Sequence, residues 1–230
     1  MGLTSSLKRI NRDSIPHFTR IALQQSRQKF DTALSYILST WWRVKLGKKC
    51  TFVGAPRFRR APSGLIEIGD RCRFLSKSDA NQHGLNRPCM LSVLSYGAQI
   101  QIGDDVGMSG TVIAAATKVS IGSRVMCGAN TTITDTDSHS LNYTHRHPAF
   151  YGIDTENFSE PVSTDGIAIG DDVFLGMNVI VLKGVTIGQG TVVGAGSIVA
   201  KSLPAGVIAV GQPAKPVANL SDYFPELMDG

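Results

Sequence analysis

The residues best suited to catalysis lie in the run Ile-Thr-Asp-Thr-Asp-Ser-His-Ser at 133–140. His139 follows Asp137 by two positions and Asp135 by four, so the three side chains would share one face of an extended segment. An imidazole can take the proton of an attacking hydroxyl near neutral pH, and a carboxylate can fix its tautomer. The spacing therefore predicts a general base at His139, oriented by Asp135, by Asp137 or by a backbone carbonyl.

The elements that must position these residues follow a six-residue repeat. From Ile169 to Pro204 the chain reads IGDDVF, LGMNVI, VLKGVT, IGQGTV, VGAGSI and VAKSLP, and every block opens on an aliphatic residue. One inward residue in every six indicates a flat face made of a short strand and its turn, and three faces close a triangular coil. The repeat predicts an all-β solenoid, a left-handed parallel β-helix. A β-sandwich fits less well, because its strands alternate at period two.

Earlier hexads extend this solenoid toward the N-terminus and stop just before His139. IGDDVG opens at Ile102 and IGSRVM at Ile121, and the rule runs to Ile133. Residues 134–168 then break it with a polar, aromatic and turn-rich stretch. Loops of this length in compact domains are usually functional, so we expect one that leaves a corner of the prism and brings His139 to a cleft.

Charge divides the chain into unlike parts. Residues 1–60 carry 13 Lys and Arg against two acids, whereas residues 61–230 carry 10 against 16. The basic part therefore needs an explanation separate from the acidic body. We expect a basic helical segment at 1–49, a β-helix domain at 50–217 with the active-site loop at 134–168, and a C-terminal tail at 218–230 that caps the open end.

Apolar residues recur at three- and four-residue steps within the basic segment, between His17 and Leu46, as on one face of an amphipathic helix. We interpret this as a helix that packs its stripe on the β-helix or on a neighbouring subunit. The alternative is a basic amphipathic helix at a membrane surface. Nucleic-acid binding is disfavoured, because no reading motif accompanies the charge. The stripe comprises Phe30, Leu34, Ile37, Leu38, Trp41 and Val44.

Cysteine usage and hydropathy indicate an intracellular protein. The four cysteines show no CxxC or similar spacing, which favours buried, reduced thiols. We find no apolar run long enough to span a membrane and no apolar signal-peptide core at the N-terminus. We expect a cytoplasmic location, peripheral at the inner face of the membrane if the basic helix binds lipid.

Together these motifs resemble the hexapeptide-repeat acetyltransferases, especially the maltose and galactoside O-acetyltransferases and the sugar O-acetyltransferases of surface-polysaccharide pathways. The resemblance covers roughly residues 50–217. It implies a homotrimer with active sites between subunits, acetyl-CoA as donor, a saccharide hydroxyl as acceptor and His139 as the base. It rests on the hexads, on the 133–140 run with the loop after it, on VLKGVTIGQG at 181–190, on GAGSIVAK at 194–201 and on VGQPAK at 210–215.

The same resemblance assigns binding residues by motif position. The acetyl-CoA contacts would be Phe174, Gly176 and Met177 near the thioester, Ala195 further along the arm, and Lys201 and Lys215 at the adenosine phosphates. On the acceptor side, Thr111 takes the place at which galactoside-type enzymes have an asparagine. We expect Tyr143 and Arg146 in the loop to bind hydroxyls or a phosphate.

Two alternatives to sugar O-acetylation share the fold. One is N-acetylation of an amino sugar nucleotide or a xenobiotic, and the other is a non-catalytic scaffold, which intact His139, Lys201 and Lys215 argue against. The related γ-class carbonic anhydrases bind a metal through three histidines. Here His139, His145 and His147 all lie in one loop and not on successive coils, so we expect no metal.

Overall fold

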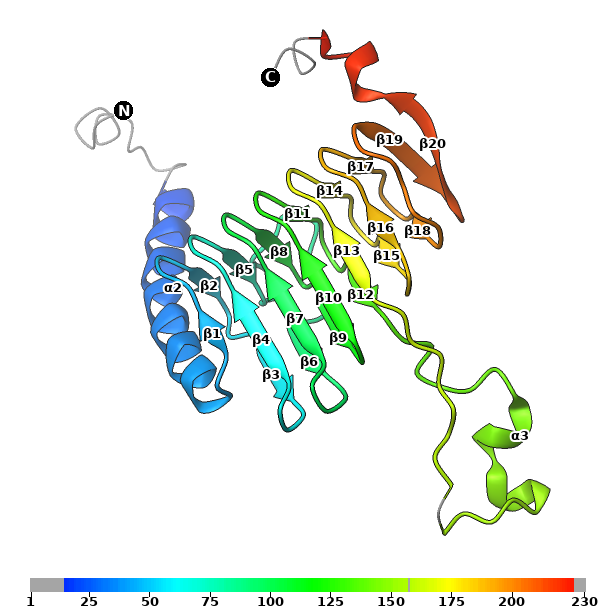
Figure 1. Cartoon of the computed structure of the whole chain (residues 1–230). Helices are drawn as coiled ribbons and strands as arrows, with labels where there is room; N and C mark the ends of the chain where they lie inside the picture. Colours follow the sequence, from blue (N-terminus) through cyan, green and yellow to red (C-terminus); the bar gives the residue numbers. More distant parts are fainter. Residues whose placement is uncertain (1–14, 157, 226–230) are drawn as a thin grey trace.

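The chain folds as a prism of three sheets, termed A, B and C, in a computed structural model that describes residues 15–156 and 158–225 (Figure 1). Successive strands visit A, B and C in turn, and neighbours within a sheet pair in parallel except for β19 and β20. This confirms the left-handed parallel β-helix that the hexads predict.

Each sheet runs the length of the prism. Sheet A contains β1 (Lys45–Leu46), β4 (Leu65–Ile68), β7 (Gln99–Ile102), β10 (Lys118–Ile121), β13 (Ile167–Ile169) and β16 (Thr186–Ile187). Sheet B contains β2 (Thr51–Val53), β5 (Arg73–Leu75), β8 (Gly107–Ser109), β11 (Met126–Cys127), β14 (Phe174–Leu175), β17 (Val192–Val193), β19 (Val207–Gly211) and β20 (Ala214–Asn219). Sheet C contains β3 (Arg57–Arg60), β6 (Met90–Val93), β9 (Val112–Ala115), β12 (Thr132–Thr134), β15 (Ile180–Val181) and β18 (Ile198–Val199).

Inward side chains stack in register along the prism and form its core. The residues that open the six C-terminal hexads are at most 4% exposed, as the repeat predicts. Small residues let coils meet closely at the corners, since a Cβ on Gly176 would lie 2.6 Å from the amide nitrogen of Ala195. The four cysteines are buried and unpaired, which confirms the expected thiols, and burial raises the pKa of Cys127 to about 12.

Helix α2 (Ile15–Trp41) covers the open end of the first coil through its polar face. Thr32 Oγ1 accepts a hydrogen bond from Phe52 N at 3.1 Å, the Asp31 carboxylate accepts one from Gly54 N at 2.8 Å, and Tyr36 Oη donates to Gly47 O at 2.9 Å. A terminal coil presents backbone groups without strand partners, and these side chains satisfy some of them.

The helix itself confirms the sequence prediction, but most of its apolar stripe does not pack on the β-helix of the same chain, which was one of the two packing partners expected. Phe30, Ile37 and Trp41 are 70%, 67% and 81% exposed, because the hydrogen-bonding side chains occupy the inner face. Val44, just beyond the helix, is the buried member of the stripe, and Leu34 and Leu38 are partly covered.

The ends of the β-helix differ slightly from the expected boundaries. Strand β1 pairs with β4, so the first coil begins before residue 50, and β20 extends past residue 217. Strand β20 runs antiparallel to β19 and covers its edge, followed by the 3-10 helix η2 (Leu220–Asp222). No helix in the described residues is long and apolar enough to cross a membrane.

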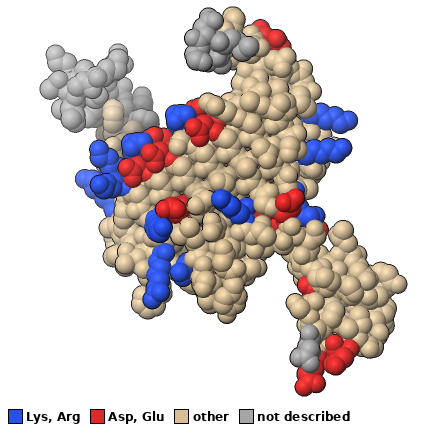
Figure 2. All heavy atoms as spheres, viewed as in Figure 1, with Lys and Arg blue, Asp and Glu red and all other residues tan. Residues whose placement is uncertain are grey.

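The 134–168 insertion leaves the corner between sheets C and A and stands clear of the prism (Figures 1 and 2). It carries a short helix, α3 (Tyr143–Arg146), and a 3-10 turn, η1 (Pro148–Tyr151). The predicted protruding loop is therefore present, with some regular structure of its own.

Candidate functional site

The loop rises from the prism on a two-stranded stalk. Thr136 forms an antiparallel bridge with Thr164, Asp137 N donates to Ser163 O at 3.1 Å, and Asp165 N donates to Asp135 O at 2.9 Å. Because hydrogen bonds join the two segments at the base of the loop, the stalk fixes where the backbone leaves the prism and so helps to position the residues that follow it.

Asp135 anchors the stalk to the preceding coil. Its side chain is fully buried and accepts hydrogen bonds from Ala116 N at 2.6 Å, Thr117 N at 2.8 Å and Thr117 Oγ1 at 2.9 Å. Three donors converging on one buried carboxylate hold its side chain in a fixed position. Its hydrogen bonds point into the C–A corner, and within the described structure none joins it to His139.

Asp137 is also engaged elsewhere. Both of its carboxylate oxygens lie 2.8 Å from Lys183 Nζ, and Lys183 belongs to the corner between β15 and β16. The pair ties the stalk to the next coil on the C-terminal side. The alternation of Asp135, Asp137 and His139 therefore does not bring the three side chains together here, because the two carboxylates bind the coils on either side of the stalk.

His139 faces a different acid, Glu160, from the returning leg of the loop. Its Nδ1 lies 3.4 Å from Glu160 Oε2, and the ring is largely exposed. The other carboxylate oxygen of Glu160 accepts a hydrogen bond from Ser140 N at 2.6 Å. This contact, with smaller contributions from His139 and the charge of Arg146, holds the pKa of Glu160 below its usual value.

This arrangement suits an imidazole that accepts a proton. If Nδ1 donates toward Glu160, the ring is held as the tautomer with a free Nε2 lone pair. Sequence reasoning missed Glu160, because it lies 21 residues from His139 in a stretch with no period. Only the pairing of the two loop legs brings them together.

The loop residues expected to bind the acceptor lie close to this pair. Arg146 Nη1 donates to Ser140 O at 2.6 Å, which braces the backbone next to His139. The ring of Tyr143 meets that of Tyr151 edge-on at 5.4 Å and is largely exposed. Both side chains therefore lie on an open surface of the loop.

Thr111 does not fit the acceptor role in this structure. Its side chain is fully buried inside the prism, and Oγ1 has no hydrogen-bond partner among the described residues. A residue that points into the core cannot contact a sugar. Thr111 therefore occupies the expected motif position in the sequence, but its side chain is not exposed to an acceptor.

The predicted acetyl-CoA contacts fall at two separate corners of one chain. Phe174 is half-exposed in a groove on sheet B, whose cavity of about 320 Å³ is also lined by Met126, Gly128 and Ser109. Gly176, Met177 and Ala195 follow at the corner between B and C, and Lys215 lies exposed on β20. Lys201 lies exposed after β18, at the C–A corner from which the loop of His139 leaves.

In the part of the chain that the structure describes, no group of three His, Cys, Asp or Glu side chains could hold a metal ion. His145 instead lies 3.3 Å from Ser140 Oγ through Nδ1, and its ring is 5.7 Å from that of Phe158. His145 is thus part of the packing within the loop.

Comparison with known proteins shows which family and which relative the chain resembles. The model described as bacterial transferase hexapeptide, with six repeats, matches residues 166–201, which form the last coils. Over these residues the chain is similar to the hexapeptide-repeat family. Among curated proteins, one from Schizosaccharomyces pombe, named provisionally as an acetyltransferase, is 41% identical over 104 residues. That match spans 45% of this chain and 44% of the relative.

Solved structures of two acyltransferases superpose over most of the chain. The acetyltransferase VCA0836 of Vibrio cholerae is 25% identical, with a TM-score of 0.54 over 86% of this chain and 91% of that one. It has also been solved with acetyl-CoA. The N-acyltransferase AntD of Bacillus cereus, solved as a point mutant with dTDP and coenzyme A, is 18% identical, with a TM-score of 0.60 over 84% and 93% of the two chains. This second likeness concerns the fold alone.

Proposed function

We propose that this chain is an acetyl-CoA-dependent O-acetyltransferase that acetylates a hydroxyl of a sugar or a surface-polysaccharide precursor, with His139 as general base. The observation that carries the proposal is the His139–Glu160 pair, with Nδ1 at 3.4 Å from the carboxylate and the ring open to solvent. The Vibrio cholerae relative, which binds acetyl-CoA, supports the choice of donor.

In the proposed reaction, Nε2 of His139 takes the proton of the acceptor hydroxyl as its oxygen attacks the thioester carbonyl. The tetrahedral intermediate collapses with cleavage of the carbon–sulfur bond. The departing thiolate receives the proton from the imidazolium, so free CoA and an acetyl ester result. Glu160 stabilises the transient imidazolium and keeps the ring in position, and it does not itself take the proton.

The separation of the cofactor residues supports a site shared between chains. Lys201 lies at the C–A corner, and sheet C separates it from the other contacts, so the C–A corner of one copy would meet the sheet B groove of another. We propose a homotrimer in which His139 and Lys201 of one chain act beside Phe174, Gly176, Met177 and Ala195 of the next. Lys215 would close the C-terminal end of that groove.

The two lysines test the proposed donor site. We expect Lys201→Ala and Lys215→Ala each to raise the KM for acetyl-CoA about fivefold, because an exposed ion pair contributes at most about 1 kcal/mol. Lys118→Ala, another exposed lysine, serves as control and should leave KM alone. Steady-state thiol release at saturating acceptor measures this. Equal KM values in all three variants would show that the cofactor register is misplaced.

Glu160 gives a second test, of positioning. We expect Glu160→Gln to lower kcat about 10- to 100-fold without changing the KM for acetyl-CoA, and Glu160→Asp to recover part of the loss. The amide keeps an acceptor for Ser140 N but removes the charge that stabilises the imidazolium. A KM effect without a kcat effect would contradict the positioning role.

The direction in which the pKa of Glu160 is shifted predicts how its contacts with Ser140 and His139 depend on pH. The pKa of Glu160 is lowered in the folded protein, so its bonds to Ser140 and His139 contribute fully above the ordinary carboxyl pKa and are lost as pH falls through the lowered value. In the wild-type protein the contacts of Glu160 with Ser140 and His139 should therefore break only under acid conditions. The Glu160→Gln variant should lack that acid transition. Fluorescence or NMR of the loop against pH measures it.

A further inference from the structure

The outer face of α2 carries large apolar side chains in one line. Leu23, Phe30 and Ile37 are two helical turns apart, with Trp41 one turn further, and they are 59%, 70%, 67% and 81% exposed. Scattered exposed apolar residues need no explanation, but an aligned stripe on one helix does. We call these four residues the outer stripe.

The outer stripe cannot turn inward to pack on its own prism. The opposite face of α2 holds the first coil through hydrogen bonds of Thr32, Asp31 and Tyr36. Rotating the helix would break those bonds and leave the terminal backbone groups of the coil unpaired. The orientation of the stripe is therefore fixed by the capping role of the polar face.

The flanks of the outer stripe are positively charged. By helical spacing, exposed Arg20 and Arg27 lie on one side of the stripe and exposed Lys29 on the other. Asp31 is the sole acid of α2, and it faces inward, 2.8 Å from Lys77 Nζ. Between residues 15 and 41 the charged side chains on the outward surface are therefore all cations.

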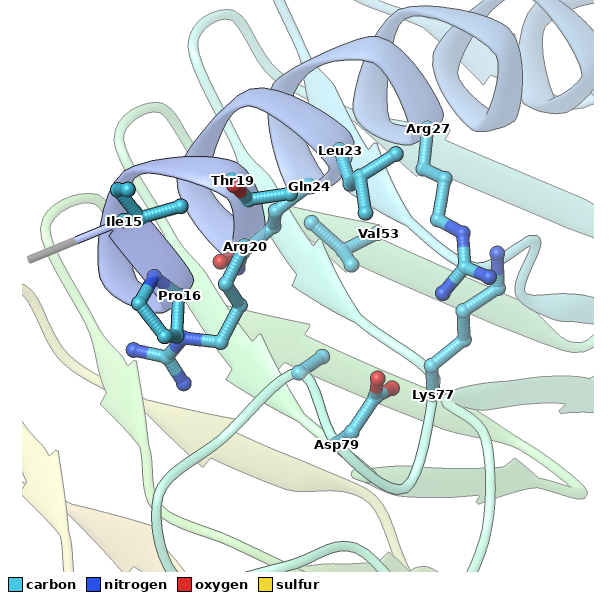
Figure 3. Close-up of a pocket in the computed structure, with 11 residues that line it drawn as sticks. Ile15, Pro16, Thr19, Arg20, Leu23, Gln24, Arg27, Val53, Lys77 and Asp79 are labelled. Carbon is cyan, nitrogen blue, oxygen red and sulfur yellow. The ribbon is translucent and has the colours of Figure 1, made fainter. Parts of the chain in front are cut away.

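A cavity of about 440 Å³ opens beside the stripe, between α2 and residues 77–80 (Figure 3). Leu23 and Val53 give it apolar walls, and Figure 3 shows the side chains of Arg27 and Lys77 converging at one end. Lys77 is already paired with Asp31, and Asp79 lines the same cavity, so the cationic flanks of the helix, and not the cavity, are suited to meet an anionic surface.

We propose that α2 docks the protein on an anionic lipid surface, with the outer stripe at the boundary of headgroups and acyl chains. An interfacial helix has this combination of an apolar line, cationic flanks and no acids. A second copy is the poorer occupant, because face-to-face helices would bring like charges together. This inference is independent of the proposed acetyl transfer.

The chain offers a direct probe, because its two tryptophans are Trp41 and Trp42, at the end of α2. In the full-length Trp42→Phe variant, emission reports on the outer stripe alone. We expect a blue shift and co-sedimentation with vesicles of phosphatidylcholine and phosphatidylglycerol, falling as salt is raised, and neither with phosphatidylcholine alone. No shift and no sedimentation with anionic vesicles would overturn the proposal.

Matched variants separate the contributions. Substitution of Arg20, Arg27 and Lys29 by Gln should weaken binding to anionic vesicles roughly a hundredfold, from about fivefold for each cation. Phe30→Glu with Ile37→Glu should abolish binding. Tyr96→Glu changes an exposed aromatic residue in a turn and should leave binding intact. Light scattering of the Phe30→Glu, Ile37→Glu double variant tests the other occupant. If the particle is smaller than wild type while circular dichroism is unchanged, the stripe joins copies of the chain and lipid docking is refuted.

Discussion

Replacing His139 by alanine is expected to lower kcat by about 10²- to 10⁴-fold, the usual contribution of a positioned general base. The ring is largely exposed, and its polar contact among the described residues is with Glu160, so its removal should leave the core unchanged. Stability and the KM for acetyl-CoA should therefore remain close to wild type. Steady-state thiol release with a working acceptor measures the change.

His83→Ala is the matched control for this substitution. His83 is another exposed loop histidine, and its side chain makes no hydrogen bond in the described structure. The same chemical change there should leave kcat unaltered. An unchanged kcat in His139→Ala would remove His139 from the role of base and leave the loop with an acceptor-binding role alone.

Replacing Asp135 by alanine is expected to lower the free energy of unfolding by about 3 kcal/mol, because buried donors lose their shared acceptor. Three donors, Ala116 N, Thr117 N and Thr117 Oγ1, converge on this fully buried carboxylate. The loss falls where the loop joins the coil, so the stalk should loosen as well. Urea denaturation followed by circular dichroism measures the change.

Asp137→Ala provides the comparison within the same stalk. Asp137 pairs with Lys183 where both side chains are about a quarter exposed, at 24% and 29%. Partly exposed ion pairs contribute about 1 kcal/mol or less, so this variant should be much the milder of the two. Equal losses in both variants would contradict the structural role of Asp135. A stable Asp135→Ala with the kcat of His139→Ala would restore it as the orienting acid.

The hexads predicted the β-helix correctly because one constraint repeats in every block. A residue such as Val181 must stack on Ile133 and Val199, so the same burial requirement recurs at a fixed interval. No burial requirement at a fixed interval determines the conformation of the loop. The contact of His139 with Glu160 crosses the insertion, and only its paired legs determine it.

The α2 helix shows a second limit of the pattern. Phe30, Ile37 and Trp41 define an apolar face, but periodicity does not say whether that face turns toward the prism. The deciding groups are Asp31, Thr32 and Tyr36, whose hydrogen bonds to the first coil depend on tertiary placement. The prediction was right about the helix, but within one chain the polar face and not the apolar stripe packs on the β-helix, and packing of the stripe on a neighbouring subunit stays a prediction.

The central claim is acetyl transfer to a hydroxyl with His139 as the base, and product analysis of wild type against His139→Ala tests it most directly. Both proteins are incubated with acetyl-CoA and a panel of neutral, amino and nucleotide-linked sugars, and released thiol and acetylated product are measured together. The proposal predicts acceptor-dependent CoA release by wild type, an alkali-labile ester as product, and loss of both in His139→Ala. An alkali-stable amide, or equal product from the two proteins, would contradict it.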